Sequence, residues 1–417
     1  MRGMMVAFMK ALFSLLIACF VLPAAANAAE VSPMVASDQT AVVEGNNEFA
    51  VALYGKLCSQ DGNLFFSPES ISTALAMTYA GARSDTATEM AKTLHFALPP
   101  DRLHPAMGAL LSGLNASHDN YQLRVANALW AQQDYKFRDD FLKLTESDYG
   151  AGLNQVDFRG ATEAARLTIN QWVEQKTSDK IKDLLKPGVL NPATRLVLTN
   201  AIYFKADWLA QFQKAHTVDE NFYLSTAHKN VTASLMHRTG SYNYFNGGTF
   251  QALEILYKSG DLSMIVFLPK DVDSLPAFEQ SLTPSNTRQW LSQLQPVPRV
   301  IVTFPKFKVT EQFELGRTLA SMGMPAAFKL GAADFSGMTG NRELFLSAVI
   351  HKAFIDVNEA GTEAAAATAA VMVGMAMRAP DRTPPTEFRA DHPFLFLIRD
   401  NRSGSILFMG RVTDPTK

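Results

Sequence analysis

Hydrophobic positions recur at helical spacing near the start of the chain. Phe49, Leu53 and Leu57 follow one another at four-residue intervals, directly after Asn46 and Asn47. Asparagine side chains cap helix starts by accepting hydrogen bonds from free backbone N–H groups. We therefore expect an amphipathic helix that begins at these two asparagines, preceded by a polar lead over residues 30–40.

A strand and a second helix are expected next. The apolar run 63–66 is short and is broken by the pair Ser67 and Pro68. Residues 70–79 return to helical spacing, and the pattern stops near Gly81.

The second half of the chain has the pattern of a β-sheet protein. Continuous apolar runs at 196–204 and 262–268 predict strands that are buried on both faces, and the alternation within 300–304 predicts a strand covered on one face. Residues 394–398 and 405–410 flank a polar turn and predict a hairpin. Because helices precede strands without regular alternation, we expect an α+β fold.

Composition limits the possible classes of function. The 417 residues are 47% hydrophobic and carry a net charge of −2, which predicts a large core and excludes a dedicated nucleic-acid binder. The sequence has two cysteines, and Cys19 lies in the N-terminal apolar run. Cys58 is then the sole thiol of the mature chain, so we expect no intramolecular disulfide.

The N-terminus resembles a secretory signal. Arg2 and Lys10 precede the apolar stretch 11–22, and a run of small residues follows at 24–29. This order predicts a signal peptide over 1–28 and a mature domain over 29–417. The alternative is a lipobox ending at Cys19, which would make the protein a lipoprotein anchored through that residue. Both alternatives take the chain out of the cytoplasm, and a secreted protein without disulfides is more typical of bacteria than of animals.

Motifs of enzyme chemistry are missing from the sequence. It contains no GxSxG, HExxH, P-loop or GxGxxG pattern, and its eight histidines are not spaced as metal ligands. We therefore expect no enzyme activity, no metal and no obligatory cofactor. His351 lies between apolar residues, and we interpret it as a buried histidine satisfied by a hydrogen bond rather than a catalytic group.

The segment that begins at Glu359 is unusual in composition. Residues 359–370 are almost entirely alanine, threonine and glutamate, and the first large apolar residue after them is Val371. Alanine favours helices, but a helix here would have nothing with which to pack, and it would run into the proline-rich stretch 379–385. We expect an exposed, weakly anchored segment of more than thirty residues, and such segments are usually functional.

Six motifs, in order along the chain, resemble those of the serpin family. They are Asn63–Ser72, Thr199–Lys205 with Trp208, Phe304–Phe307, His351–Ala353, Asn358–Ala365 and Asp391–Phe396. The resemblance implies three β-sheets, about nine helices and an exposed reactive-centre loop at about 359–388. It also implies suicide inhibition, in which a target serine protease, or alternatively a cysteine protease, forms a covalent 1:1 complex with a monomer.

Small residues in the loop are consistent with its insertion into a sheet. Alternate positions of an inserted strand face the core, which would place Thr362, Ala364, Ala366, Thr368 and Ala370 inward and Glu363 outward. The hinge consists of Glu359 and Gly361 through Thr368, including Ala365 and Ala367. It contains no bulky side chain, which favours an inhibitor over the alternative, a non-inhibitory binding protein with a serpin fold.

The resemblance also assigns roles outside the loop. It implies that Glu359 pairs with Lys306 and that Trp208 lies where the loop enters the sheet. Ser70, Asn200 and His351 resemble a cluster beneath the central strands that must separate, which we call the shutter.

The scissile bond is expected near the middle of the loop. Counting from Glu359 gives Met375–Ala376, which suits elastase-, chymotrypsin- or subtilisin-like proteases. The loop is longer than usual on its C-terminal side, and the alternative Arg378–Ala379 would suit a trypsin-like protease. Met377 and Arg382 are further alternatives.

Overall fold

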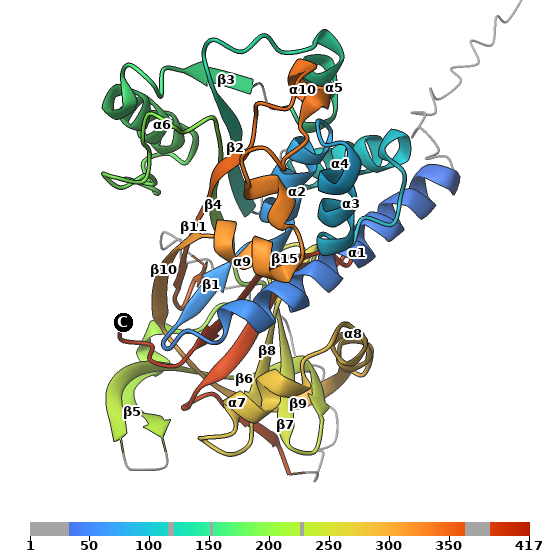
Figure 1. Ribbon diagram of the computed structural model, residues 1–417. Coiled ribbons are helices and arrows are strands. Elements are labelled where there is room, and N and C mark those ends of the chain that lie inside the picture. Colours follow the sequence, from blue (N-terminus) through green and yellow to red (C-terminus); the bar gives the residue numbers. More distant parts are fainter. Residues whose placement is uncertain (1–32, 116–120, 151–152, 226–228, 363–383) are drawn as a thin grey trace, which may run out of the picture.

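The computed structural model describes residues 33–115, 121–150, 153–225, 229–362 and 384–417 (Figure 1). Within these ranges, no helix is both long enough and apolar enough to cross a membrane. The predicted signal peptide, residues 1–28, and Cys19 lie outside the described residues.

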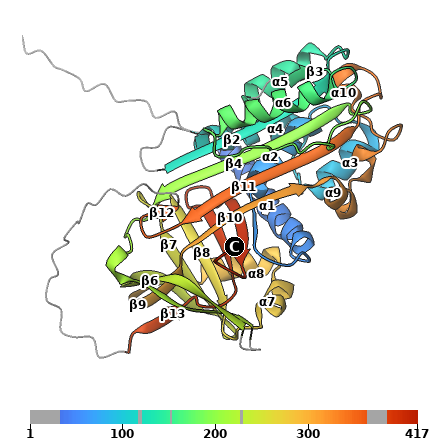
Figure 2. The same ribbon diagram turned by 90° about the vertical axis from the view of Figure 1, so that its left-hand side faces the viewer.

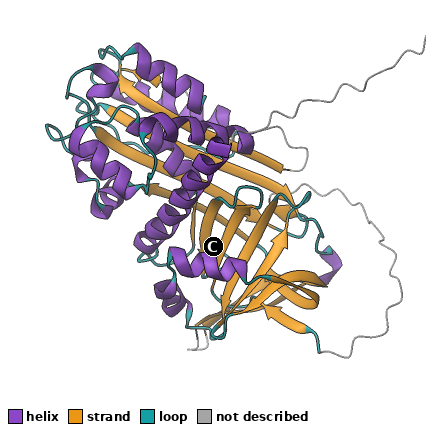
Figure 3. Ribbon diagram, turned by 90° about the vertical axis from the view of Figure 1, so that its right-hand side faces the viewer, coloured by secondary structure: helices purple, strands orange, loops and turns teal. Residues whose placement is uncertain are grey.

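Most helices gather at one end of the molecule, whereas α7 and α8 lie beside the strands at the other end (Figures 1 and 3). The central helix α2 is buried along its whole length, because it packs between α1 and strands of both sheets. The α-helices of the described residues are α1 (Pro33–Leu57), α2 (Pro68–Tyr79), α3 (Ser84–Thr93), α4 (Pro100–Asn115), α5 (Asp139–Tyr149), α6 (Thr162–Lys176), α7 (Leu275–Ser281), α8 (Pro284–Ser292), α9 (Gly316–Met322) and α10 (Ser336–Thr339).

A six-stranded sheet contains the strands that matter most for function. Its order is β10-β11-β12-β4-β2-β3, and β11 also pairs directly with β4. The strands are β2 (Tyr121–Gln132), β3 (Leu153–Val156), β4 (Leu196–Asp207), β10 (Phe307–Glu314), β11 (Leu346–Val357) and β12 (Gly361–Thr362).

A nine-stranded sheet forms the other end of the molecule. Its members are β1 (Leu64–Phe66), β5 (Thr217–Ser225), β6 (Lys229–Asn246), β7 (Phe250–Leu256), β8 (Leu262–Pro269), β9 (Gln295–Pro305), β13 (Thr386–Arg389), β14 (Phe394–Asp400) and β15 (Ile406–Val412). The α+β class is confirmed. The expected three sheets form two hydrogen-bonded units, because β6 is continuous and pairs with β5 and β9 along most of its length and with β7 at its end.

Several predicted elements are confirmed, but the predicted start of the first helix is wrong. α1 begins at Pro33, so Asn46 and Asn47 lie inside it rather than at its cap. Their amides serve tertiary contacts instead. Asn46 accepts a hydrogen bond from Ser72 at 2.7 Å, and Asn47 bonds the backbone of Gly404 and Ile406 in the C-terminal hairpin.

Two hydrophobic clusters cover the faces of the six-stranded sheet. The larger one joins α1, α2 and the nine-stranded sheet, and it includes inward-facing residues of β4 such as Leu198 and Ile202. The smaller one lies beneath α6, where Ile169 and Val173 pack against the sheet with Val197 from β4. β4 is therefore buried on both sides, as its continuous apolar run predicts.

Candidate functional site

The candidate site is the seam between β4 and β11 in the six-stranded sheet (Figure 2). These two strands run parallel and pair from Leu196 with Leu346 to Tyr203 with Phe354. Beyond this point β12 lies between them. Thr362 pairs with Val357 of β11 on one side and with Ala206 of β4 on the other, antiparallel to both. β4 and β11 are therefore paired directly along most of the seam, and they are separated by β12 at one end, which we call the open end.

The start of the candidate loop is buried, which corrects the expectation of an exposed segment. Glu359, Gly361 and Thr362 are all buried, and Thr362 has no exposed surface. The physical reason is that β12 satisfies its backbone groups in the sheet and not in water. At the other end of the predicted loop, Thr386 begins β13, which pairs with β9.

Gly361 is required by its close approach to β4. A Cβ atom at this position would lie 2.1 Å from the carbonyl oxygen of Ala206 and 2.6 Å from the Cα of Asp207. No side chain fits at that distance. The glycine therefore allows the chain to turn into the seam from the Asn358–Gly361 turn, where the N–H of Asn358 donates to the carbonyl of Gly361 at 2.9 Å.

Two aromatic side chains hold β12 at its entry point. The indole of Trp208 stacks on the ring of Tyr257 at a centroid distance of 4.5 Å, and its Nε1–H donates to the carbonyl of Asn358 at 3.0 Å. The hydroxyls of Tyr257 and Thr362 share a hydrogen bond of 2.8 Å in a fully buried position. The structure therefore places Trp208 beside the start of the loop, next to a tyrosine that contacts the first inserted side chain.

An ion pair lies at the base of the loop. The carboxylate of Glu359 lies 3.1 Å from Lys306 Nζ and accepts a hydrogen bond of 2.9 Å from Thr217 Oγ1. Burial tends to raise the pKa of Glu359. Hydrogen bonds from its own backbone N–H, from Thr217 and from Lys306 outweigh burial and hold that pKa below its ordinary value. The carboxylate is therefore charged at neutral pH and ties the loop base to β5 and to the end of β9.

The shutter residues come together beneath the middle of the seam. Asn200 of β4 lies opposite His351 of β11 in the strand register, and its Oδ1 accepts a hydrogen bond from His351 Nδ1. Its Nδ2 donates to Ser70 Oγ at 2.6 Å and also to Asn127 Oδ1. One buried asparagine thus joins both strands of the seam to β2 and α2.

His351 is neutral in this cluster. Its Nε2 accepts a hydrogen bond of 3.1 Å from the backbone N–H of Ser67, so the proton lies on Nδ1 and is donated to Asn200. Burial lowers its pKa to about 3. The interpretation of His351 as a buried, hydrogen-bonded histidine agrees with this geometry.

The face of the seam that lies away from the shutter is covered by the segment that follows α6. The Nζ of Lys352 on β11 donates to the carbonyl of Lys182 at 2.7 Å, and Lys180 Nζ lies 5.7 Å from the ring centroid of Tyr203 on β4. The segment therefore contacts both strands of the seam.

Several predicted site residues lie outside the described residues, and the structure adds others. The residues outside the described ranges are the hinge residues 363–368, both candidate bonds, Met375–Ala376 and Arg378–Ala379, and the alternatives Met377 and Arg382. Sequence reasoning missed Asn127, Thr217 and Tyr257. Asn127 is a polar residue within the apolar run of β2, which is a signal for a buried hydrogen bond, whereas Thr217 and Tyr257 carry no such signal.

The described residues contain no group of three or more histidine, cysteine, aspartate or glutamate side chains placed to hold a metal ion. The chemistry of the seam rests instead on backbone pairing and on the buried hydrogen bonds of the shutter.

Comparisons with known proteins identify the family. The chain is 42% identical to the leukocyte elastase inhibitor of Equus caballus over 379 residues, covering 89% of this chain and 98% of that protein. An uncharacterized serpin-like protein of Thermococcus kodakarensis is 40% identical over 90% of this chain and 86% of its own length. The crystal structure of uncleaved ovalbumin superposes with a TM-score of 0.81 at 27% identity, covering 90% of this chain and 100% of that one. The family model for serpins, described as serine protease inhibitors, matches residues 44–415, and the chain therefore belongs to the serpin family.

Proposed function

We propose that this serpin is a monomeric suicide inhibitor of a serine protease, with a cysteine protease as the alternative target. The single observation that carries the proposal is β12, a short antiparallel strand that occupies the open end of the seam between β11 and β4. A loop that begins as a strand in this position needs only to extend the same pairing to become a full member of the sheet.

The register of β12 determines which residues would become neighbours if this strand were extended along the seam. Thr362 lies opposite Ala206 and Val357. Six residues further along the inserted strand, Thr368 would lie opposite Asn200 and His351, which are six residues back along β4 and β11. The hydroxyl of Thr368 would then enter the shutter, where it can replace the hydrogen bond that now joins the two strands.

The faces of the inserted strand also support insertion. Thr362 points to Tyr257 in the core, so every second residue after it points the same way. These residues are Ala364, Ala366, Thr368 and Ala370, and all are small. Glu363 would point to the other face. Insertion would therefore add backbone hydrogen bonds and apolar contacts without burying a charge on the core side, which makes the uncut form metastable.

The covalent step follows from cleavage of the loop. The protease serine Oγ attacks the carbonyl carbon of Met375, an ester forms between them, and the amide bond to Ala376 breaks as the amine of Ala376 leaves with a proton. The names of several relatives, leukocyte elastase inhibitors, favour an apolar residue such as Met375 at this position. Arg378–Ala379 is the alternative bond, with a trypsin-like target.

Incubation with purified proteases tests the proposal directly. The secreted protein is mixed with elastase-, chymotrypsin-, subtilisin- and trypsin-like proteases, and the products are separated on denaturing gels. A denaturant-resistant band at the summed mass is expected. The released C-terminal peptide should begin at Ala376, and a start at Ala379 would select the alternative. Cleavage by every protease without this band would refute inhibition and favour the non-inhibitory binding protein.

Secretion is a separate part of the proposal. We infer that residues 1–28 are a signal peptide and that the inhibitor acts outside the cytoplasm as a bacterial-type secreted serpin. N-terminal sequencing of the exported protein should give Ala29 as the first residue. A lipid-modified Cys19 at the N-terminus would instead establish a membrane-anchored lipoprotein.

A further inference from the structure

A chain of ionisable side chains lies away from the seam, at the C-terminal end of the predicted reactive loop. β13 ends at Arg389, and the motif Asp391–Phe396 follows it and leads into β14. Arg389 Nε donates to Asp391 Oδ2 at 2.7 Å, and Asp391 Oδ1 lies 2.9 Å from His392 Nδ1. The three side chains therefore contact one another in a row beside the end of β13, and no step of the proposed inhibition uses them.

This row of side chains is attached to two other strands of the nine-stranded sheet. His392 Nε2 lies 2.7 Å from the carbonyl oxygen of Pro269 at the end of β8. The guanidinium of Arg389 pairs with the carboxylate of Glu220 on β5. The end of β13 is therefore joined to both β5 and β8 through side chains. We call Glu220, Arg389, Asp391 and His392 the clasp.

The geometry of His392 requires a protonated ring. Its two nitrogens face a carbonyl oxygen and a carboxylate oxygen, and neither of these atoms can donate a hydrogen bond. A neutral imidazole has only one N–H, so it can satisfy only one of them. Burial tends to raise the pKa of Asp391, but hydrogen bonds from His392 and Arg389 outweigh burial and hold that pKa below its ordinary value. Asp391 is therefore ionised, and the buried ring of His392 carries the matching positive charge.

His237 lies beside the clasp but is satisfied without a charge. Its Nε2 lies 2.8 Å from Glu220 Oε1, and its Nδ1 lies 3.1 Å from the hydroxyl of Thr303 on β9. A hydroxyl can donate as well as accept. The neutral ring can therefore donate from Nε2 to Glu220 and accept at Nδ1 from Thr303. His237 thus provides an internal comparison for His392, whose two partners can only accept.

We propose that His392 makes the clasp a pH-sensitive fastening for β13. The protonated ring joins Asp391 to the end of β8. When the ring loses its proton, a nitrogen lone pair faces one of the two acceptors, that contact breaks, and β13 separates more readily from β9. The titratable groups around the ring are Arg389 and Asp391 from β13 and the residues after it, Glu220 from β5 and His237 from β6, and β8 contributes the carbonyl of Pro269.

The direction of the effect follows from the form that the clasp requires. A histidine that gains partners only when it is charged stabilises the structure at low pH, and this stabilisation is lost as the ring deprotonates. The C-terminal end of the predicted reactive loop is thus held more firmly at acidic pH than at alkaline pH. The inference concerns the uncut chain and needs no protease, so it can fail while the proposed function holds, and the reverse.

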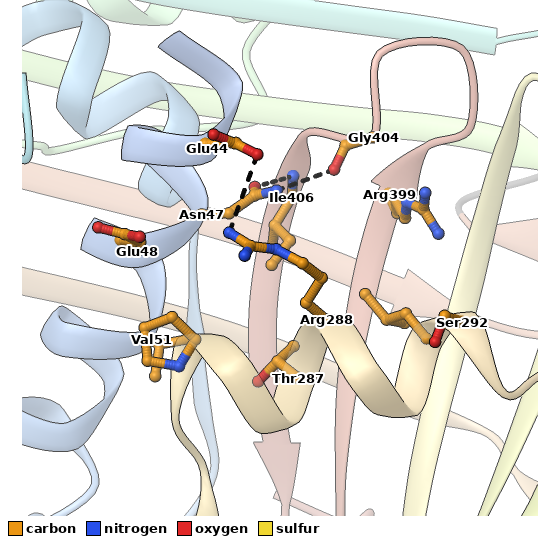
Figure 4. Close-up of a pocket in the computed structure, with 12 residues that line it drawn as sticks. Glu44, Asn47, Glu48, Val51, Thr287, Arg288, Ser292, Arg399, Gly404 and Ile406 are labelled. Atoms are coloured by element: carbon orange, nitrogen blue, oxygen red, sulfur yellow. Dashed lines mark hydrogen bonds and ion pairs between the residues drawn. The ribbon is translucent and has the colours of Figure 1, made fainter. Parts of the chain in front are cut away.

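Hydrogen exchange of the uncut protein at pH 5.5 and pH 8.5, measured by mass spectrometry and corrected for intrinsic exchange, tests the inference. β15 is the reference for changes in the whole fold, because Asn47 of α1 ties its hairpin through Gly404 and Ile406 (Figure 4). Relative to β15, residues 386–390 should be protected at least about tenfold more strongly at pH 5.5, since a hydrogen bond to a charged group is worth at least that factor.

Two variants separate His392 from the other groups. His392→Gln should abolish the pH difference, and its exchange over residues 386–390 at pH 5.5 should rise to the wild-type level at pH 8.5. His237→Gln is the matched control and should keep the difference, because neutral His237 is already satisfied. The thermal midpoint of each variant checks that it is folded. Nitrogen chemical shifts of the wild-type imidazole rings, measured by NMR, should show both nitrogens of His392 protonated at pH 5.5.

Three results would overturn the inference. They are equal protection of β13 relative to β15 at the two pH values, a pH difference that persists in His392→Gln, and a neutral His392 ring at pH 5.5. If His392→Gln fails to fold, the ring shifts and the comparison of β13 with β15 still decide the question, because both are measured on the wild-type protein.

Discussion

The buried carboxyl group of Glu69 should make the stability of this serpin depend on pH. Glu69 lies in the first turn of α2, two residues after the Ser67 whose N–H contacts His351, and it is almost completely buried. Burial raises its pKa from 4.5 to about 7, even though Thr73 Oγ1 donates to it a hydrogen bond of 3.0 Å that favours the charged form.

The sign and size of the effect follow from this shift. A carboxyl group whose pKa is raised in the folded state contributes no penalty below its unfolded pKa of 4.5, and its penalty grows as pH rises to about 7. Above that pH the penalty is constant. A shift of this size corresponds to about 3 kcal/mol of lost stability at pH 8.

The variant Glu69→Gln should remove this penalty, because glutamine is uncharged at every pH and can still accept a bond from Thr73. At pH 8 its thermal midpoint should exceed that of the wild type by roughly 3–4 °C, taking about 0.8 kcal/mol/K as the unfolding entropy of a chain of this size. At pH 4.5 the two midpoints should nearly coincide. Glu146→Gln, at an exposed position on α5, is the matched control and should show no pH-dependent difference.

Calorimetric scans at one fixed rate, from pH 4.5 to pH 8, measure these midpoints. A difference between Glu69→Gln and the wild type that stays the same across this range would refute the argument from ionisation. A lower midpoint for the variant at pH 8 would show that the charged carboxylate stabilises the fold.

Three further predictions concern the seam. Thr362→Arg would place a charge in a fully buried hinge position, so the protease should cut the variant without the denaturant-resistant band on gels, whereas Thr362→Ser should keep that band. Gly361→Val should expel β12, and hydrogen exchange over residues 358–362 should rise at least about tenfold by mass spectrometry, because the pairing of β12 holds in place the turn whose hydrogen bonds protect these amides. Gly55→Ala, where an added Cβ meets nothing within 4 Å, should leave that exchange unchanged. His351→Ala would leave Asn200 Oδ1 and the Ser67 N–H without partners, so urea unfolding at pH 8 should show a loss of about 2–4 kcal/mol. This loss should shrink as pH falls from 6.5 toward 3, because the lowered pKa of His351 makes protonation favour the unfolded wild-type chain, and the variant lacks this group. A loss of stability that is independent of pH would contradict a neutral imidazole at His351.

Local patterning was sufficient to predict the strands that are buried on both faces. The continuous apolar runs of β4 and β8 are confirmed as buried strands, because short β-branched and aromatic runs between turn residues favour strands that are covered on both faces. The turn between β14 and β15 is confirmed as well. The second helix is confirmed as well, and Ser67 caps it by accepting a hydrogen bond from the N–H of Ser70. Of the serpin motifs, Asn63–Ser72 spans β1 and the start of α2, and Thr199–Lys205 lies in β4, whereas Asn358–Ala365 begins in the turn before β12.

The same local rules failed where a residue's partner is far along the chain. Asn46 and Asn47 have the residue type of a helix cap, yet their partners are Ser72 and the hairpin at 404–406. Glu359 and Gly361 have the composition of an exposed loop, yet both are buried. In each case a tertiary hydrogen bond outweighs the local preference, which is worth about 1 kcal/mol or less.

The sequence by itself determined the family and the strands that are buried on both faces, because those properties depend on residue type and spacing. Only the tertiary structure decided that Thr362 already lies between β11 and β4 and that Tyr257 and Asn127 belong to the site. The free energy of pairing across the seam and the cost of desolvating a buried group both depend on many residues that are distant in sequence. No local pattern encodes them, and they exist only once the chain has folded.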